Sequence, residues 1–310
     1  MARQSIFCVL VEFSAAFILI EIARRLLFAV FSPIDYLRRS LFGLLLFYVV
    51  FYGAYIIFLL LIIFVIRRGK WTLSDLGLGN RISWKRDISY GVLSFALIML
   101  VISPVFPFLI PIYARGSSGI AALLSHGPIY LILILLLLVP IHLLQAPIPE
   151  ELFYRGYYQG VLSETTQDRV AIIASGLFFG FIHGVYHTDW PIELLIIPIV
   201  SGVIFGIIYW KTGSLIPSMT GHFLVNYLLV FPPALYKDNL ISEAYILFGF
   251  MVVFSIIALL VGRKQLRELV ISAYSEFKQV RLRDILEICF FVIVSLLIVF
   301  AFRLLMLSLI

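Results

Sequence analysis

Long, uninterrupted apolar runs constrain the fold of this chain more than any other feature. A helix needs about 20 mostly apolar residues to cross the hydrocarbon core of a bilayer. Runs of roughly that length cover residues 5–31, 40–66, 87–111, 127–149, 169–186, 192–211, 215–231, 241–262 and 285–308. They are continuous, whereas strands of membrane barrels alternate apolar and polar residues. The sequence therefore predicts an all-α, polytopic transmembrane helix bundle of about 8–9 spans, the lower number if one of the two shortest runs is incomplete.

Composition excludes a soluble domain. The chain is 63% hydrophobic and 13% charged, whereas soluble domains are about 45–50% apolar and about 25% charged. With so few charges, most of the surface must face lipid, so membrane lipid is an expected partner. The net charge of +6 does not indicate nucleic-acid binding, because excess Lys and Arg in a membrane protein usually lie in cytoplasmic loops.

Basic residues gather in two of the predicted loops. Loops 67–86 and 263–284 are rich in arginine and lysine, whereas loops 112–126 and 232–240 carry one basic residue each. By the positive-inside rule the first two loops are cytoplasmic. The expected location is a multi-pass position in a prokaryotic plasma membrane or in the endoplasmic reticulum, and the sequence does not separate the two. The basic, partly amphipathic stretch 264–284 is expected to form a solvated or membrane-surface helix.

Ionisable residues inside apolar segments are costly, and are therefore candidates for function. If the helix through 127–149 continues past Glu150 to about Ser163, and the next helix begins near Arg169, the two helices are antiparallel neighbours. At about 1.5 Å per residue, Glu150 and His183 then lie roughly 20 Å from the turn between them. The spacing therefore places a carboxylate and an imidazole at the same depth on facing helices, on the cytoplasmic side of the membrane.

Two further pairs have the spacing of one helical turn. Glu151 and Arg155 are four residues apart and can form an ion pair. His222 and Asn226 have the same spacing, so both project from one face of their helix. A carboxylate with an imidazole can deprotonate a water molecule, and a His–Asn pair can donate hydrogen bonds to the oxyanion formed when that water attacks an amide. The combination predicts amide hydrolysis without a covalent intermediate.

These residues resemble the motifs of the CPBP family, which contains the type II CAAX prenyl endopeptidases and the abortive-infection proteases. The motifs read Glu150-Glu151-x-x-x-Arg155, Phe179-x-x-x-His183 and His222-x-x-x-Asn226, and they follow the family's order. The resemblance covers residues 127–232. We accordingly expect N-terminal membrane helices over 1–126, a catalytic core of four helices over 127–232, and C-terminal membrane helices with a basic loop over 233–310.

The resemblance implies a glutamate-dependent intramembrane endopeptidase. It implies that Glu150 and His183 activate water and that His222 and Asn226 form the oxyanion site. Glu151, Arg155 and Phe179 are then supporting residues. In the prenyl endopeptidases the substrate is a protein or peptide C-terminus with a prenylated cysteine, from which the last three residues are removed.

A cofactor or a catalytic metal is not predicted. The two glutamates and the two histidines of the motifs are residue types that bind zinc. However, the sequence has no His-Glu-x-x-His and no Glu-x-x-His of di-iron type. Arg155, one turn beyond the glutamates, also disfavours additional positive charge. His126, His142 and His187 are expected to be structural, although His187 shares a helix face with His183.

Two other classes of function stay open at this stage. A transporter with a polar relay would favour paired broken helices in two related halves, and the sequence has no internal repeat. A non-catalytic membrane scaffold could retain the family fold while binding a partner. The presence of every motif residue argues against that loss of activity.

Overall fold

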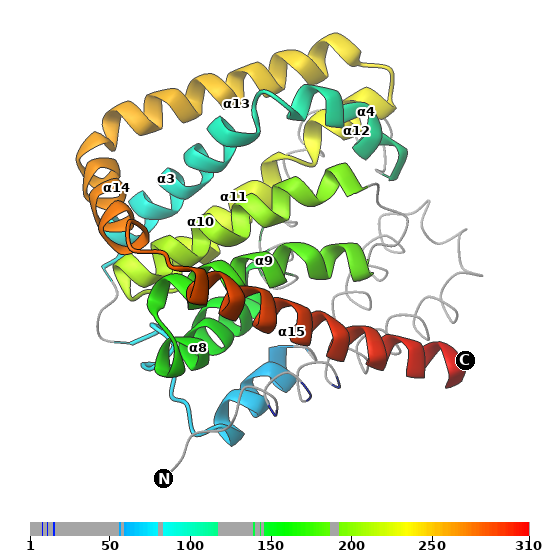
Figure 1. Ribbon diagram of the computed structural model, residues 1–310. Helices are drawn as coiled ribbons and strands as arrows, with labels where there is room; N and C mark the ends of the chain where they lie inside the picture. Colours follow the sequence, from blue (N-terminus) through cyan, green and yellow to red (C-terminus); the bar gives the residue numbers. More distant parts are fainter. Residues whose placement is uncertain are drawn as a thin grey trace.

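The computed structural model describes four stretches of the chain and a few isolated residues. They are residues 59–79, 83–116, 146–186 and 192–309, with residues 8, 11, 15, 56, 139 and 143. All regular secondary structure within them is helical, which confirms the all-α fold (Figure 1). Most of each of the expected runs 5–31, 40–66 and 127–149 lies outside the described residues, as do His126, His142 and His187.

The labelled helices follow the chain in a simple order. They are α3 (Trp84–Ile102), α4 (Phe106–Gly116), α7 (Pro147–Glu151), the π-helix η3 (Leu152–Gln159), α8 (Gly160–Thr165), α9 (Asp168–Tyr186), the 3₁₀-helix η4 (Ile192–Leu195), α10 (Ile196–Thr212), α11 (Ile216–Leu228), α12 (Phe231–Lys237), α13 (Ile241–Val261), α14 (Arg263–Phe277) and α15 (Leu282–Leu309).

Four helical stretches in the described part of the chain are long and apolar enough to cross a membrane. They are Asp168–Val185, Ile192–Thr212, Ile241–Val261 and Leu282–Ala301. A fifth span results only if α3 and α4, which are bent by 96° at their junction, are counted together. The chain is therefore a multi-pass membrane protein with four to five candidate spans among these residues, and the expected number of about 8–9 is not confirmed.

Two of the expected apolar runs do not form a single straight helix long enough to cross a membrane. Run 87–111 is interrupted at residues 103–105, where Pro104 cannot donate a backbone hydrogen bond. In run 215–231, α11 has 13 residues, or about 20 Å at 1.5 Å per residue. The prolines at 232 and 233 then start α12. Proline spacing, which hydropathy does not register, therefore decides both helix lengths.

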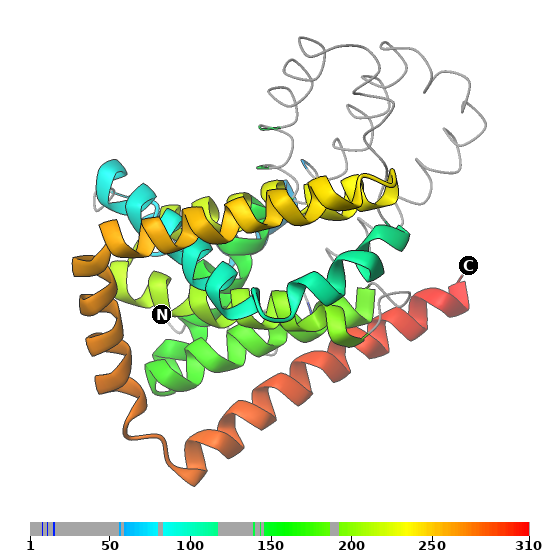
Figure 2. The ribbon, with the colours of Figure 1, turned by 90° about the horizontal axis from the view of Figure 1, so that it is seen from above.

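The helices around α9 and α11 form a packed series. α13 packs on α3, α3 on α11, α11 on α10, α10 on α9, and α9 on α15 (Figure 1). Figure 2 shows that α14 runs across the ends of α13 and α15 instead of continuing either helix. The expected helix in the stretch 264–284 is thus confirmed as α14. The series places α9 and α11, which carry the motif histidines, inside the bundle.

Glycines allow α9 and α10 to approach closely. A Cβ atom at Gly176 would lie 2.7 Å from the backbone nitrogen of Val203, and one at Gly202 would collide with the Gly176 carbonyl oxygen. Helices in membranes pack through such small residues, because there is little hydrophobic gain in bringing two apolar helices together within lipid. The glycine contact therefore fixes the position of α9 relative to α10.

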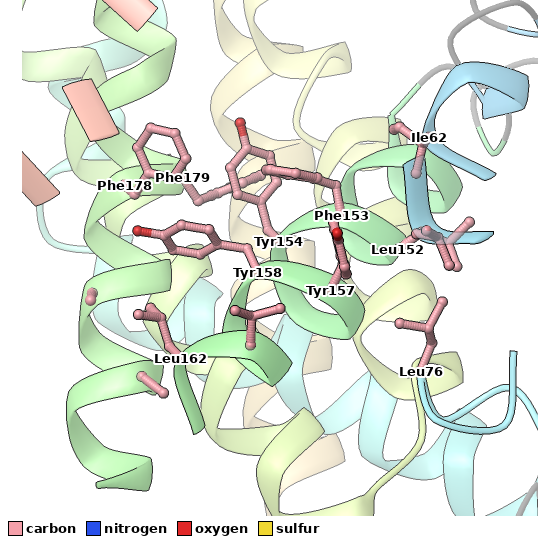
Figure 3. Packing of buried hydrophobic residues seen from close by; sticks show 14 of the residues in the cluster. Ile62, Leu76, Leu152, Phe153, Tyr154, Tyr157, Tyr158, Leu162, Phe178 and Phe179 are labelled. Atoms are coloured by element: carbon pink, nitrogen blue, oxygen red, sulfur yellow. The ribbon is translucent and has the colours of Figure 1, made fainter. Parts of the chain in front are cut away.

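An aromatic cluster forms the core beside the π-helix. Figure 3 shows that Tyr154 and Tyr158 of η3 point toward Phe178 and Phe179 of α9. The ring centroids of Tyr154 and Phe179 are 5.0 Å apart, and those of Tyr158 and Phe178 are 5.2 Å apart. The Tyr158 hydroxyl also lies 2.8 Å from Ser295 Oγ of α15. The cluster therefore joins the motif helices to the C-terminal helix.

A buried carboxylate holds the start of α11. The Ser214 hydroxyl donates to Asp87 of α3 over 3.0 Å, and Asp87 is fully buried. Gly213 has a φ of 62°, which a residue with a side chain rarely adopts. It ends α10 and lets the chain turn back into α11. This turn sets the position at which α11 enters the bundle.

Candidate active site

The two glutamates lie on a helix that crosses from the apolar core to the turn before α9. α7, η3 and α8 follow one another without a break from Pro147 to Thr165, and α9 begins at Asp168. The sequence predicts that this helix ends near Ser163 and that the next begins near Arg169. The turn of this hairpin is therefore confirmed to within two residues. Its first helix, however, begins at Pro147 after the non-helical Ala146, so it does not continue unbroken from the run 127–149 as expected.

The sequence did not predict the π-helical geometry that follows Glu151. η3 spans eight residues, Leu152–Gln159, and all eight are buried. π-Helical turns are rare and occur frequently at functional sites. The wider turn changes which side chains share a face, so Arg155 and its aromatic neighbours are placed differently from residues on a regular α-helix. Residue type and spacing carry no clear signal for it.

Glu151 is the centre of a buried charge network. His222 Nδ1 donates to Glu151 Oε1 over 2.8 Å, and Arg155 Nε lies 3.3 Å from Glu151 Oε2. The side chains of Glu151 and Arg155 are fully buried. The expected pairing of these two residues is thus confirmed. A buried carboxylate between an arginine and a histidine holds the imidazole in one orientation.

Phe179 lies against three of the motif side chains. The guanidinium carbon of Arg155 is 4.6 Å from the centroid of its ring, which is a cation–π distance. The ring centroids of His183 and His222 lie 4.8 and 5.6 Å from that of Phe179, both with edge geometry. One phenyl ring therefore spaces the two imidazoles and covers the arginine.

His222 contacts both glutamates. Its Nδ1 atom binds Glu151, and its Nε2 atom lies 3.9 Å from Glu150 Oε2. The second distance is longer than a hydrogen bond, but one water molecule could contact both atoms. The family resemblance implied a role for His222 in the oxyanion site only. Its position beside Glu150 is new information from the structure.

His183 is held by its own helix. Its Nδ1 atom lies 2.7 Å from the carbonyl oxygen of Phe179, one turn earlier on α9. A carbonyl oxygen only accepts, so Nδ1 carries the proton and the lone pair of the neutral ring is on Nε2. His183 is partly exposed. Nε2, the basic nitrogen of the neutral His183 ring, therefore faces away from the backbone of α9.

Exposure separates the motif residues into two groups. Glu151, Arg155 and His222 are buried, whereas the Glu150 side chain is 23% exposed. The Oε2 atom of Glu150, which faces His222, is itself buried and has no hydrogen-bond partner among the described residues. Asn226, one turn after His222 on α11, is exposed. The side chains of Glu150 and Asn226 thus reach the surface of the described structure, whereas Glu151, Arg155 and His222 lie inside it.

Sequence reasoning missed Ser218. This buried serine lies one turn before His222 on α11, and its hydroxyl is 3.0 Å from the Leu215 carbonyl oxygen and also contacts the Glu151 side chain. The spacing Ser218, His222, Asn226 repeats every four residues, so a search for polar residues on one helix face would have found it.

Among the residues that the structure describes, no three or more His, Cys, Asp or Glu side chains gather in a way that could hold a metal ion. The expectation of a metal-free, cofactor-free site remains a prediction.

Comparison with known proteins identifies one family. Residues 130–228 match the model of a family described as type II CAAX prenyl endopeptidase Rce1-like. This is about a third of the chain, and it contains all the motif residues. No curated protein and no solved structure matches the chain.

Proposed function

From the Rce1-like type II CAAX prenyl endopeptidase domain that residues 130–228 form, we propose that the chain is a glutamate-dependent intramembrane endopeptidase. It cleaves a peptide bond near the C-terminus of a membrane-associated protein. The observation that carries this proposal is the buried Glu151–His222 pair, which lies within reach of the accessible Glu150. An ordered carboxylate–imidazole pair beside a second carboxylate is an arrangement suited to acid–base chemistry.

In the proposed reaction, Glu150 and His183 activate the attacking water. Glu150 is the accessible carboxylate, and His183 presents a basic Nε2 because Nδ1 is occupied by the Phe179 carbonyl oxygen. The water loses a proton to this pair and adds to the scissile carbonyl carbon. The same proton then passes to the leaving amine as the carbon–nitrogen bond breaks, so the reaction needs no covalent intermediate.

His222 and Asn226 stabilise the oxyanion in this proposal. In this proposal His222 acts as an imidazolium that Glu151 holds at Nδ1, and its Nε2–H donates toward the developing negative charge. The Asn226 amide is exposed one turn along the same helix and supplies a second donor. Arg155 balances the Glu151 charge, and Phe179 keeps the two imidazoles apart.

The proposed substrate is a protein or peptide C-terminus that is anchored to the membrane, and a prenylated cysteine would supply that anchor. Two observations support this class: the family description names CAAX prenyl endopeptidases, and the site lies among helices that are candidate membrane spans. A prenyl chain in the lipid would deliver the peptide from the side of the bundle.

The test is cleavage of a prenylated C-terminal peptide by the purified full-length chain in detergent, followed by mass spectrometry of the products. We expect cleavage that is abolished in Glu150→Gln and unaffected by a chelator. Glu243→Gln is the matched control, because Glu243 is an exposed glutamate at the start of α13, away from the motifs.

The possible results separate the alternatives. Activity that disappears with the chelator and returns with zinc would replace the metal-free mechanism. Equal activity in Glu150→Gln and the unaltered chain would overturn the assigned role of Glu150. If neither the prenylated peptide nor its unprenylated form is cleaved, the non-catalytic scaffold becomes the better hypothesis.

A further inference from the structure

α14 has a position that differs from that of every other long helix in the described part of the chain. It follows α13 after Gly262, and it precedes α15 by a short link. α13 and α15 are both candidate membrane spans with mostly exposed surfaces. Figures 1 and 2 show that α14 runs across the ends of both. A helix that connects two spans in this way lies at a membrane surface.

One face of α14 attaches it to the bundle. Leu269 is buried in a cluster with Tyr90 and Leu93 of α3. Lys211 of α10 donates to Ser272 Oγ over 2.7 Å, and Arg169 of α9 lies 3.5 Å from Glu276. The residues at 269, 272 and 276 follow helical spacing, so they mark the inward face.

The opposite face is apolar at its centre. Val270 and Ile271 are each 56% exposed, and Tyr274 is 70% exposed. Water would leave this apolar surface unburied, whereas the boundary between headgroups and acyl chains accommodates both aliphatic side chains and tyrosine.

Cations flank that apolar centre at both ends. They are all exposed and comprise Arg263, Lys264 and Arg267 in the first turns of α14 and Lys278 and Arg281 after it. Of the acidic residues nearby, Glu276 and Asp284 are paired with Arg169, which leaves Glu268 as the exposed acid on the helix. The outward surface is therefore strongly positive, and its cationic side chains can reach headgroups while their stems cover apolar surface.

We infer that the outward face of α14 is a binding site for anionic phospholipid headgroups, with Val270, Ile271 and Tyr274 inserted at the acyl boundary. This function is separate from the proposed peptidase site. Each cation near an anionic surface strengthens binding by about fivefold, and hence several of them together select anionic over zwitterionic lipid. Apolar insertion alone would not distinguish the two lipids.

The experiment places a reporter on this face. Tyr274→Cys, in a chain that also carries Cys8→Ser and Cys289→Ser, is labelled with an environment-sensitive dye and reconstituted in nanodiscs. The lipid is phosphatidylcholine, alone or mixed with phosphatidylglycerol, and either lipid carries a headgroup-proximal quencher. We expect the dye to be quenched by phosphatidylglycerol more strongly than by an equal amount of phosphatidylcholine.

The matched variants change charge without changing side-chain length greatly. Arg263→Gln, Arg267→Gln and Lys278→Gln together should abolish the preference for phosphatidylglycerol. The control removes three exposed cations elsewhere, at Arg67, Lys85 and Lys237, and should retain the preference. An aqueous dye spectrum in both lipid mixtures, or equal quenching by both lipids, would overturn the proposal.

A second measurement needs no substitution. Native mass spectrometry of the unaltered chain, released from mixed nanodiscs, should detect retained phosphatidylglycerol in excess over its share of the bilayer. Retention in proportion to lipid composition would contradict the proposal. This outcome is independent of peptidase activity, so it does not depend on the proposed catalytic function.

Discussion

The two adjacent glutamates, Glu150 and Glu151, have different surroundings. Glu151 is buried between Arg155 and His222, whereas the Glu150 side chain is partly exposed and lies 3.9 Å from His222 Nε2. Sequence spacing predicted that Glu151 would pair with Arg155, and the family resemblance implied that Glu150 would activate water. The pairing is confirmed, and the difference in exposure supports the assignment of the reactive group.

Replacing Glu151 by glutamine should have a different effect from replacing Glu150 by glutamine. Glu151→Gln leaves the Arg155 guanidinium buried without its counter-charge, and loss of one partner of a buried ion pair costs about 3–5 kcal/mol. We expect a clearly lower unfolding temperature together with loss of activity. Glu150→Gln should lose activity with little change in unfolding temperature, because its side chain reaches the surface.

Thermal unfolding in detergent, followed by circular dichroism, measures the stability of both variants. The peptide cleavage described above measures their activity. A stable and inactive Glu151→Gln beside an unstable Glu150→Gln would show that the two roles have been exchanged.

At the scale of elements, close contact between α9 and α10 places His183. Gly176 and Gly202 meet where no side chain fits. Glycine-rich apolar segments in the sequence predict tight helix packing in general. They do not identify which helices meet, because several helices contain glycines.

A side chain at this contact should separate the helices. Gly202→Leu adds atoms where the Gly176 backbone already lies, and overpacking of this kind costs about 1–3 kcal/mol. The expected result is a lower unfolding temperature and reduced cleavage, since α9 carries His183. Gly249→Leu on α13 is the control, because a Cβ atom there meets nothing within 4 Å. An equal loss of stability in both variants would mean that the glycine contact has no special role.

The sequence also did not predict where the helices would be interrupted. The apolar run 87–111 contains enough residues to span a membrane, yet it is broken into α3 and α4 with a bend of 96°. Hydropathy sums over a window and cannot detect where the chain turns. The π-helix η3 was missed for a related reason: its residues have no preference that separates a π-turn from an α-turn.

In the molecule as a whole, one ion network ties the family domain to the C-terminal helices. Arg169 Nε of α9 lies 2.8 Å from Asp284 Oδ2 of α15, and Arg169 Nη1 lies 3.5 Å from Glu276 of α14. The Arg281 backbone nitrogen donates to the same Asp284 oxygen. Residues far apart in the sequence thus form a single charged junction at the end of the bundle where α14 lies.

Breaking this junction should loosen the C-terminal helices. Arg169→Gln leaves two carboxylates without their cation, so we expect faster proteolysis in the link around residues 278–281 and a lower unfolding temperature. Exchanging the charges, in Arg169→Asp with Asp284→Arg, should restore part of the loss. Arg283→Gln is the control, because Arg283 forms an exposed pair with Glu287 within α15. An unchanged proteolysis pattern in Arg169→Gln would show that the helices are held by apolar contacts alone.

The sequence by itself determined that this protein is helical and built for a membrane, because apolar content and run length do not depend on how the helices meet. It also indicated the motif residues, since residue type and four-residue spacing place side chains on a common helix face. Only the tertiary structure decided that His222 contacts both glutamates, that Phe179 separates the two histidines, and that Ser218 belongs to the network. Apart from the contact of Phe179 with His183 within α9, these are contacts between different helices. They depend on glycine packing, proline breaks and a π-turn, whose effects accumulate over the bundle and are not encoded at any single position.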